Sequence, residues 1–249
     1  MNDSPLTTLL TRSATGSVLT TPSDLGALPW FIRFFLADLF AQARFGEQVA
    51  LVCAKTIFEL ENEADARAFA ATQVRDETRH LAYFDQTIAA LRVERPVMAP
   101  LVRLLTTAQR QSSLASLLMA NHLIVESLAH DLFSDVAKRL QALGQWVWLP
   151  RSWGAALRDV ASSMMGIARD ERRHVAFGVL RLSQLRDQMN SDERAHLDLL
   201  ATGWYSQLAH ALEVLPVLFL LRSVKADIVR SVLARCRQRV LDVGVELSS

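Results

Sequence analysis

Cysteine is scarce in this sequence, and the two cysteines, Cys53 and Cys236, stand far apart along the chain. Each lies within an apolar helical pattern and not in a closely spaced pair. A disulfide framework and a thiolate metal knuckle both need such pairs, so both are excluded as organising features. We expect two buried thiols.

Glycine and proline are also few, with 9 and 7 among 249 residues, and long alternating runs of Val, Ile and Thr are missing. Strand-rich folds depend on such runs and on frequent turn residues. Hydrophobic residues make up 51% of the chain, which is enough for a sizeable core. The balance predicts an all-α protein.

An excess of charge and a long uninterrupted apolar run are lacking as well. The formal net charge is +1, which gives no general attraction to nucleic acid, so we expect no nucleic-acid partner. The most apolar windows, 27–40 and 214–221, are interrupted by charges or too short to cross a bilayer. No positive leader precedes an apolar core at the start. We therefore expect no membrane span and a cytoplasmic location.

Apolar periodicity predicts six long helices and no strand. Residues 1–23 are rich in Ser and Thr, and we expect a flexible or loosely docked tail there, followed by one helical domain over 24–249. The expected helices span about 25–61, 63–93, 113–142, 153–189 and 192–214, with Ser191 as an N-cap and a last helix ending near 244. A short crossover helix is expected over 101–113.

The segment Asp-Glu-x-Arg-His occurs twice, at 76–80 and at 170–174. Residues three apart project from the same face of a helix, so Glu77 pairs with His80 and Glu171 pairs with His174. Each pair has the spacing to bind one metal ion.

Two further glutamates complete the pattern. Antiparallel helices joined near residue 62 would bring Glu47 to the height of Glu77, and a turn near residue 148 would bring Glu126 to the height of Glu171. Four buried carboxylates without partners are costly, and two divalent cations would balance their charges. Oxygen-rich ligands with one imidazole per ion suit iron or manganese. We favour two iron ions.

Three other features have simpler interpretations. Glu193 and His196 repeat the Glu-x-x-His spacing, but they stand in the first turn of a predicted helix, where acidic residues favour the helix dipole. The run of Glu59, Glu61 and Glu63 is expected to be a solvated turn. The aromatic residues of the first helix are expected in the core, with a substrate tunnel as the alternative: Trp30, Phe31, Phe34, Phe35 and Phe40.

The two pentads resemble the ferritin-like di-iron carboxylate proteins, in particular the oxygen-activating branch with the ribonucleotide reductase small subunit and the aminobenzoate N-oxygenases. The resemblance implies a ferritin-like four-helix bundle with additional C-terminal helices. It also implies six metal ligands: Glu47, Glu77, His80, Glu126, Glu171 and His174. Asp76 and Asp170 would each orient the histidine of the opposite helix. Glu47 and Glu126 would be catalytic carboxylates that shift as the metals change valence.

The chain departs from both named relatives. Phe84 stands where the reductase subunit has its radical tyrosine, and Ile167 stands where the N-oxygenases have a seventh ligand. His122 and His130 lie four residues before and after Glu126, on one face of an α-helix. Each is most simply a hydrogen-bonded core histidine, and an extra ligand, a proton relay or a substrate contact is the alternative.

The sequence therefore predicts a non-haem di-iron oxidoreductase that activates dioxygen to oxidise a small organic substrate by hydroxylation, N-oxygenation or desaturation. Flavin and iron–sulfur motifs are absent from the sequence, so an external electron donor is expected. The basic stripe on the last helix is expected to be a solvated face, with an acidic carrier protein bearing the substrate, or another subunit such as a second copy, as the alternative contact: Arg222, Lys225, Arg230, Arg235, Arg237 and Arg239.

Three alternatives stay open. A ferroxidase or peroxide-scavenging protein would use the same ligands without an organic substrate. A manganese or mixed manganese–iron protein would differ only in its metal. A metal-free helical interaction protein would keep the pattern without an ion, but four glutamates would then repel one another in the core.

Overall fold

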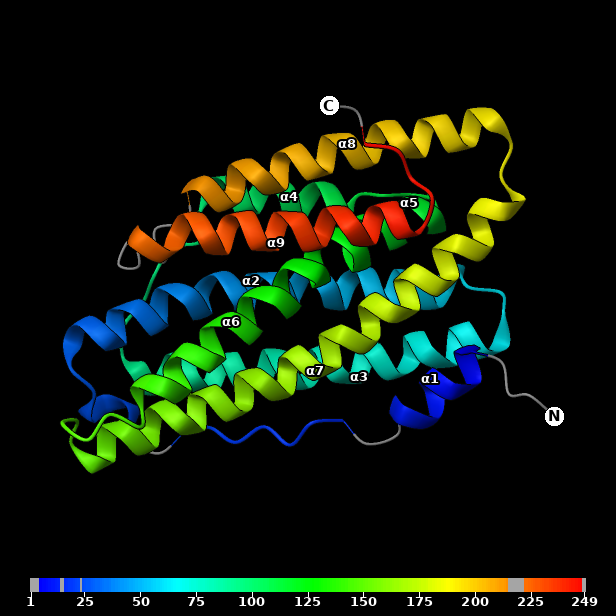
Figure 1. The fold of residues 1–249 in the computed structure, drawn as a ribbon. Helices are drawn as coiled ribbons and strands as arrows, with labels where there is room; N and C mark the ends of the chain where they lie inside the picture. Colours follow the sequence, from blue (N-terminus) through cyan, green and yellow to red (C-terminus); the bar gives the residue numbers. More distant parts are fainter. Residues whose placement is uncertain (1–4, 14–15, 23, 215–221, 248–249) are drawn as a thin grey trace.

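A computed structural model describes residues 5–13, 16–22, 24–214 and 222–247. All regular structure in these ranges is helical, which confirms the predicted all-α class (Figure 1). The elements are α1 (Pro5–Ser13), the short η1 (Leu25–Ala27), α2 (Trp30–Leu60), α3 (Ala64–Leu91), α4 (Ala99–Gln109), α5 (Leu114–Leu118), η2 (Met119–Glu126), α6 (Ser127–Leu143), α7 (Arg151–Gln188), α8 (Ser191–Val214) and α9 (Arg222–Asp242). None of the described helices has the length and apolarity needed to cross a bilayer.

Two helical hairpins form the bundle. One is α2 with α3, joined by residues 61–63, and the other is the continuous α5–η2–α6 helix with α7, joined by residues 144–150. The long helices run side by side, with both hairpin turns at the ends of the bundle (Figure 1). The antiparallel pairings that the sequence predicted are therefore present.

The turn between α2 and α3 is held by a buried ion pair. Glu61 is fully buried, and its two carboxylate oxygens accept hydrogen bonds from the Arg181 guanidinium of α7 at 2.6 and 2.8 Å. Glu63 caps α3 by accepting from the backbone N–H groups of Asp65 and Ala66. The expectation of a solvated turn was wrong for Glu61, because its charge is used to fix this turn to α7.

A π-helical segment, η2, interrupts the third long helix, where the sequence predicted a continuous α-helix. All eight of its residues are buried. Helix α7 approaches this segment closely at Gly178, where an added Cβ would lie 2.3 Å from the Cβ of His122. Only glycine leaves enough room for that approach.

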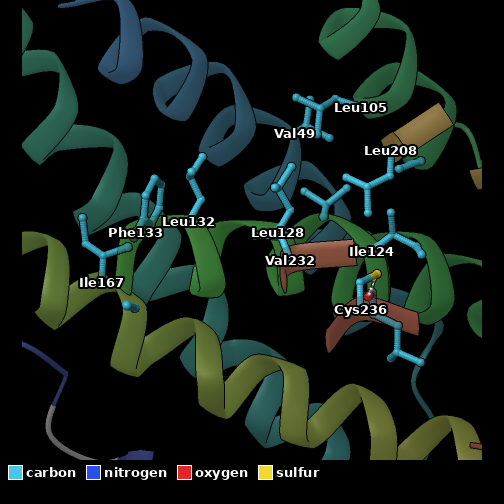
Figure 2. Close-up of a cluster of buried hydrophobic side chains, with 14 of the residues drawn as sticks. Val49, Leu105, Ile124, Leu128, Leu132, Phe133, Ile167, Leu208, Val232 and Cys236 are labelled. Carbon is cyan, nitrogen blue, oxygen red and sulfur yellow. Dashed lines mark hydrogen bonds between the residues drawn. The ribbon is translucent and has the colours of Figure 1, made fainter. Parts of the chain in front are cut away.

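An outer layer of α4, α8 and α9 covers one side of the bundle (Figure 1). Figure 2 shows the apolar cluster between the layers, with contributions from Val49, Leu105, Ile124, Leu208, Val232 and Cys236. The Cys236 thiol donates to the backbone oxygen of Leu123 at 3.3 Å. Cys53 and Cys236 are both free and buried, as predicted.

Helix α9 is fixed to α6 by ion pairs. Asp131 of α6 is buried, and it binds Arg239 at 2.8 and 2.9 Å and Arg235 at 3.0 Å. Two members of the predicted basic stripe therefore hold the fold together and are not free for a carrier protein. The side chain of Arg222 lies outside the described residues.

The N-terminal segment differs from the expected tail over the part that is described. Helix α1 packs against α3 and α7, with Leu6 buried and Thr7 donating to Asp65 at 2.9 Å. Such a short helix depends on tertiary packing for stability, which a periodicity analysis does not detect. Residues 1–4, 14–15 and 23 lie outside the described ranges.

The aromatic residues of α2 divide between core and surface. Phe40 is fully buried and Phe35 is half-buried, but Trp30, Phe31 and Phe34 are exposed. The prediction that the whole group is core was wrong for these three, because their side chains lie on the solvent-exposed side of the start of α2, while Ile32 and Phe35 face the core.

Candidate metal centre

Six side chains meet between the four long helices, in two overlapping groups. The first group is Glu47, Glu77, His80 and Glu171, and the second is Glu77, Glu126, Glu171 and His174. Within each group the candidate ligand atoms all lie within 4.8 Å of one another, and every residue is buried. The structure thus brings together the six residues that the sequence singled out.

Glu77 and Glu171 are shared by both groups. Glu77 directs one oxygen to His80 Nδ1 at 3.3 Å and the other to His174 Nδ1 at 3.2 Å. Glu171 divides its oxygens in the same way, at 3.2 and 3.5 Å. Of the two histidines, Glu47 contacts His80, at 3.4 Å, and Glu126 contacts His174, at 3.6 Å. The geometry therefore distinguishes two glutamates that both groups share from two that belong to one group each.

The Asp and Arg residues of both pentads contact the cluster histidines or each other. Asp170 lies 3.3 Å from His80 Nε2, and Asp76 lies 3.3 Å from His174 Nε2, so each aspartate faces the histidine of the other pentad. Arg79 and Arg173 each contact both aspartates, at distances from 2.7 to 3.0 Å. Each imidazole is thereby held with Nδ1 facing the cluster.

The N-terminal segment adds a contact that the sequence did not predict. The Ser17 hydroxyl lies 3.1 Å from Asp170 Oδ1 and 2.9 Å from the backbone oxygen of Gly166. An added Cβ at Gly16 would meet the Arg79 guanidinium. This segment therefore covers the outer side of the Asp170–Arg79 pair.

Two buried amides also escaped the sequence analysis. Gln73 donates to Glu126 Oε1 at 2.5 Å and to Glu77 Oε1 at 3.3 Å, and Asn121 also donates to Glu126 Oε1. Gln73 stands four residues before Glu77, so its place on the ligand face of α3 could have been recognised. Asn121 stands five residues before Glu126, which is the same-face spacing of a π-helix. No α-helical pattern would have found it.

His122 and His130 belong to neither group. His122 Nε2 lies 3.0 Å from Gln73 Oε1, and His130 Nδ1 donates to the backbone oxygen of Ala168 at 2.8 Å. The predicted shared face with Glu126 assumed α-helical spacing on both sides, and the π segment rotates His122 away. Burial, together with the charge of His174, lowers the pKa of His122 to about 3, so its imidazole is neutral.

Burial and the neighbouring charges oppose each other in the cluster, and burial outweighs them at two of the glutamates. Burial raises the pKa of Glu47 and of Glu126 well above the usual value, and His80 and His174 offset only part of this effect. Burial lowers the pKa of His80, but the charge of Glu47 and the hydrogen bond to Asp170 outweigh it and raise the pKa well above the usual value. Without cations, protons must therefore balance these carboxylates.

The donor set fits two cations. Four cluster atoms are buried and make no well-directed hydrogen bond, although each lies within 3.6 Å of a polar atom across the cluster: Glu77 Oε2, Glu126 Oε2, Glu171 Oε1 and His174 Nδ1. Buried polar atoms are rarely left unpaired, and each exception calls for an explanation. Metal coordination would satisfy all four atoms and would replace the protons.

An apolar cavity of about 70 Å³ adjoins the cluster between α2, α4 and α6. Glu47, Glu126 and Glu171 line it, and most of the remaining wall is aliphatic or aromatic. The amide of Gln42, also on the wall, is bonded to the backbone of Pro96 and Met98 at 3.0 Å each. A small molecule bound in the cavity would therefore contact apolar side chains on one side and the carboxylates on the other.

No family model and no curated protein sequence matches the chain. Among solved structures, a valine-to-leucine variant of the R2-like ligand-binding oxidase, with an aerobically reconstituted Mn/Fe cofactor, superposes with a TM-score of 0.72 at 15% identity. The alignment covers 99% of this chain and 94% of that one. The chain has the fold of an R2-like oxidase. A tyrosine-to-phenylalanine variant, with the same coverage, gives a TM-score of 0.67 at 14% identity. These matches confirm the predicted ferritin-like bundle with additional helices, at the level of the fold.

Proposed function

We propose that this protein is a non-haem oxidoreductase that holds two iron or manganese ions and uses dioxygen to oxidise a small organic molecule. The sharing of Glu77 and Glu171 between two carboxylate–histidine groups carries the proposal, because it is the arrangement expected around a pair of ions. The Mn/Fe cofactors of the R2-like oxidases support either metal, or one of each.

The bound ions would supply the redox chemistry of dioxygen reduction. The protein's own part is to fix their positions. Glu77 and Glu171 would set the spacing between the two sites, and Glu47 and Glu126 would complete one site each. Asp170 and Asp76 accept the Nε2 protons of His80 and His174, so that each Nδ1 faces inward and would bind an ion once the ion replaces its proton.

The apolar cavity supports a substrate that presents an apolar surface next to the two ions. Glu47 and Glu126 lie on its wall, so a guest there would stand beside one carboxylate of each site. The apolar remainder would exclude water during the reaction. Hydroxylation, N-oxygenation and desaturation all fit this environment, and an external electron donor is part of the proposal.

Oxygen uptake tests the proposal. The protein is loaded with Fe(II) or Mn(II) plus Fe(II) without air, freed of excess metal, and mixed with oxygenated buffer while oxygen and the optical spectrum are followed. We expect uptake proportional to bound metal and a new absorption band. Glu171→Gln should abolish both, because Glu171 belongs to both groups. His196→Ala is the matched control, since Glu193 and His196 repeat the spacing on an exposed turn.

A screen of apolar molecules with a reductant then separates the enzyme from its rivals. Substrate-dependent uptake supports the proposed oxidation. Uptake that depends only on added Fe(II) or peroxide would contradict it in favour of a ferroxidase or peroxide scavenger. Failure to bind metal would leave a helical interaction protein.

A further inference from the structure

One end of the bundle carries an exposed aromatic surface. Trp146, Val147 and Trp148 form the tip of the α6–α7 turn, and they are 63%, 93% and 94% exposed. At the start of α2, Trp30 and Phe31 are 71% and 53% exposed. Both segments lie at the left end of the molecule in Figure 1.

The two segments belong to one surface. Phe31, Ile32 and Phe35 of α2 line an apolar groove together with Leu140 and Leu143 of α6, directly before the turn. Three of the five tryptophans of the chain are exposed here. We call the surface formed by Trp30, Phe31, Phe34, Trp146, Val147 and Trp148 the aromatic end.

An excess of positive charge surrounds the aromatic end. The segments that form it, 24–35, 91–95 and 139–151, contain five arginines and only two acidic residues: Arg33, Arg92, Arg95, Arg139, Arg151, Asp24 and Glu94. Arg139 lines the groove, and the Arg95 guanidinium stacks over the Phe34 ring at 4.0 Å and pairs with Asp38 at 3.1 Å, which leaves the other four arginines to supply the excess. The whole chain has a net charge of only +1, so this excess is local.

We propose that the aromatic end docks on the surface of an anionic lipid bilayer. Tryptophan prefers the interface between headgroups and acyl chains, and arginine is attracted to anionic headgroups. The exposed tip at Trp146–Trp148 is suited to insertion between the lipid headgroups. The aromatic end shares no residue with the carboxylate cluster, so lipid docking can be tested independently of metal binding.

Vesicle co-sedimentation tests the docking. The full chain is mixed with vesicles of phosphatidylcholine alone, or of phosphatidylcholine with phosphatidylglycerol, and the pelleted fraction is measured. We expect stronger pelleting with the anionic vesicles, weakened by salt. Trp148→Ser should lower the partition coefficient about tenfold, since most of the burial of one large apolar side chain is lost. Arg139→Gln should lower it about fivefold, and only with anionic vesicles.

Leu199→Ser is the matched control, because Leu199 is 70% exposed on α8, away from the aromatic end. It should pellet like the wild type, and circular dichroism should show that each variant is folded. The proposal is overturned if the wild type stays in the supernatant with both vesicles, or if Trp148→Ser and Leu199→Ser behave alike. It is also overturned if sedimentation velocity shows a dimer that Trp148→Ser dissociates while vesicles bind nothing.

Discussion

Gln73 connects the two hairpins of the bundle through a single amide. Its nitrogen donates to Glu126 and Glu77, and its oxygen faces His122 Nε2. Because His122 is neutral and fully buried, its Nε2 proton has Gln73 as its partner. The amide therefore sets the orientation of Glu126 without being a ligand itself.

Gln73→Leu should weaken metal binding at the site completed by Glu126 about 10–100-fold, as expected when a group that orients a ligand is lost. Stability should also fall by about 1–3 kcal/mol, because His122 loses its partner. Chelator competition measures the first effect, and urea unfolding measures the second.

Gln42→Leu is the control for that variant, because it removes a buried amide that bonds to the backbone of the 96–98 loop and to none of the carboxylates. It should lower stability while leaving metal affinity unchanged. Equal losses of affinity in both variants would contradict the role assigned to Gln73.

Cys236 makes stability depend on pH. Burial raises the pKa of this thiol to about 12, above the value of about 9 in the unfolded chain. The folded state therefore keeps its proton longer, so the stabilising contribution is present below pH about 9 and is lost between about 9 and 12. Over that range, the free energy of unfolding in urea should fall more steeply with pH for the wild type than for Cys236→Ala. Parallel pH profiles would contradict this.

At the scale of an element, the π segment η2 depends on its contact with α7. Gly178→Ala would place a Cβ 2.3 Å from His122 Cβ, so the helices must separate. We expect a loss of about 1–3 kcal/mol, typical of an overpacked core. The urea unfolding midpoint measures it.

Gly203→Ala provides the comparison on α8, because an added Cβ there meets nothing within 4 Å. This variant should gain about 0.5–1 kcal/mol from the better helix propensity of alanine. If Gly178→Ala were equally stabilising, the close approach at η2 would be contradicted.

The long helices could be predicted because their apolar periodicity is strong and their ends are marked by polar residues and proline. The fifth predicted helix begins where expected, but Asn190 and not Ser191 accepts the hydrogen bonds of its first turn. The π segment could not be predicted, because its wider turns are not marked by any distinct amino-acid composition. Helix α1 was missed because neighbouring helices stabilise it.

At the scale of the whole molecule, the cluster has an approximate two-fold arrangement, with each hairpin supplying one Glu-x-x-His pair and one glutamate that belongs to a single group. Spacing along the chain was enough to predict this, because antiparallel hairpins bring residues equidistant from a turn to one height. Which glutamates belong to both groups could not be predicted, since that depends on how the hairpins face each other. The exposed aromatic end was also missed, because helical spacing is the same in a core and on a projecting turn.

Metal content per chain tests the central claim most directly. After anaerobic loading with Fe(II), we predict about two ions in the wild type, about one in Glu47→Gln or Glu126→Gln, and almost none in Glu77→Gln or Glu171→Gln. These losses follow from the membership of each glutamate in one group or in both. Equal losses in all four variants would contradict the two-site geometry, and wild-type protein without stoichiometric metal would contradict the centre itself.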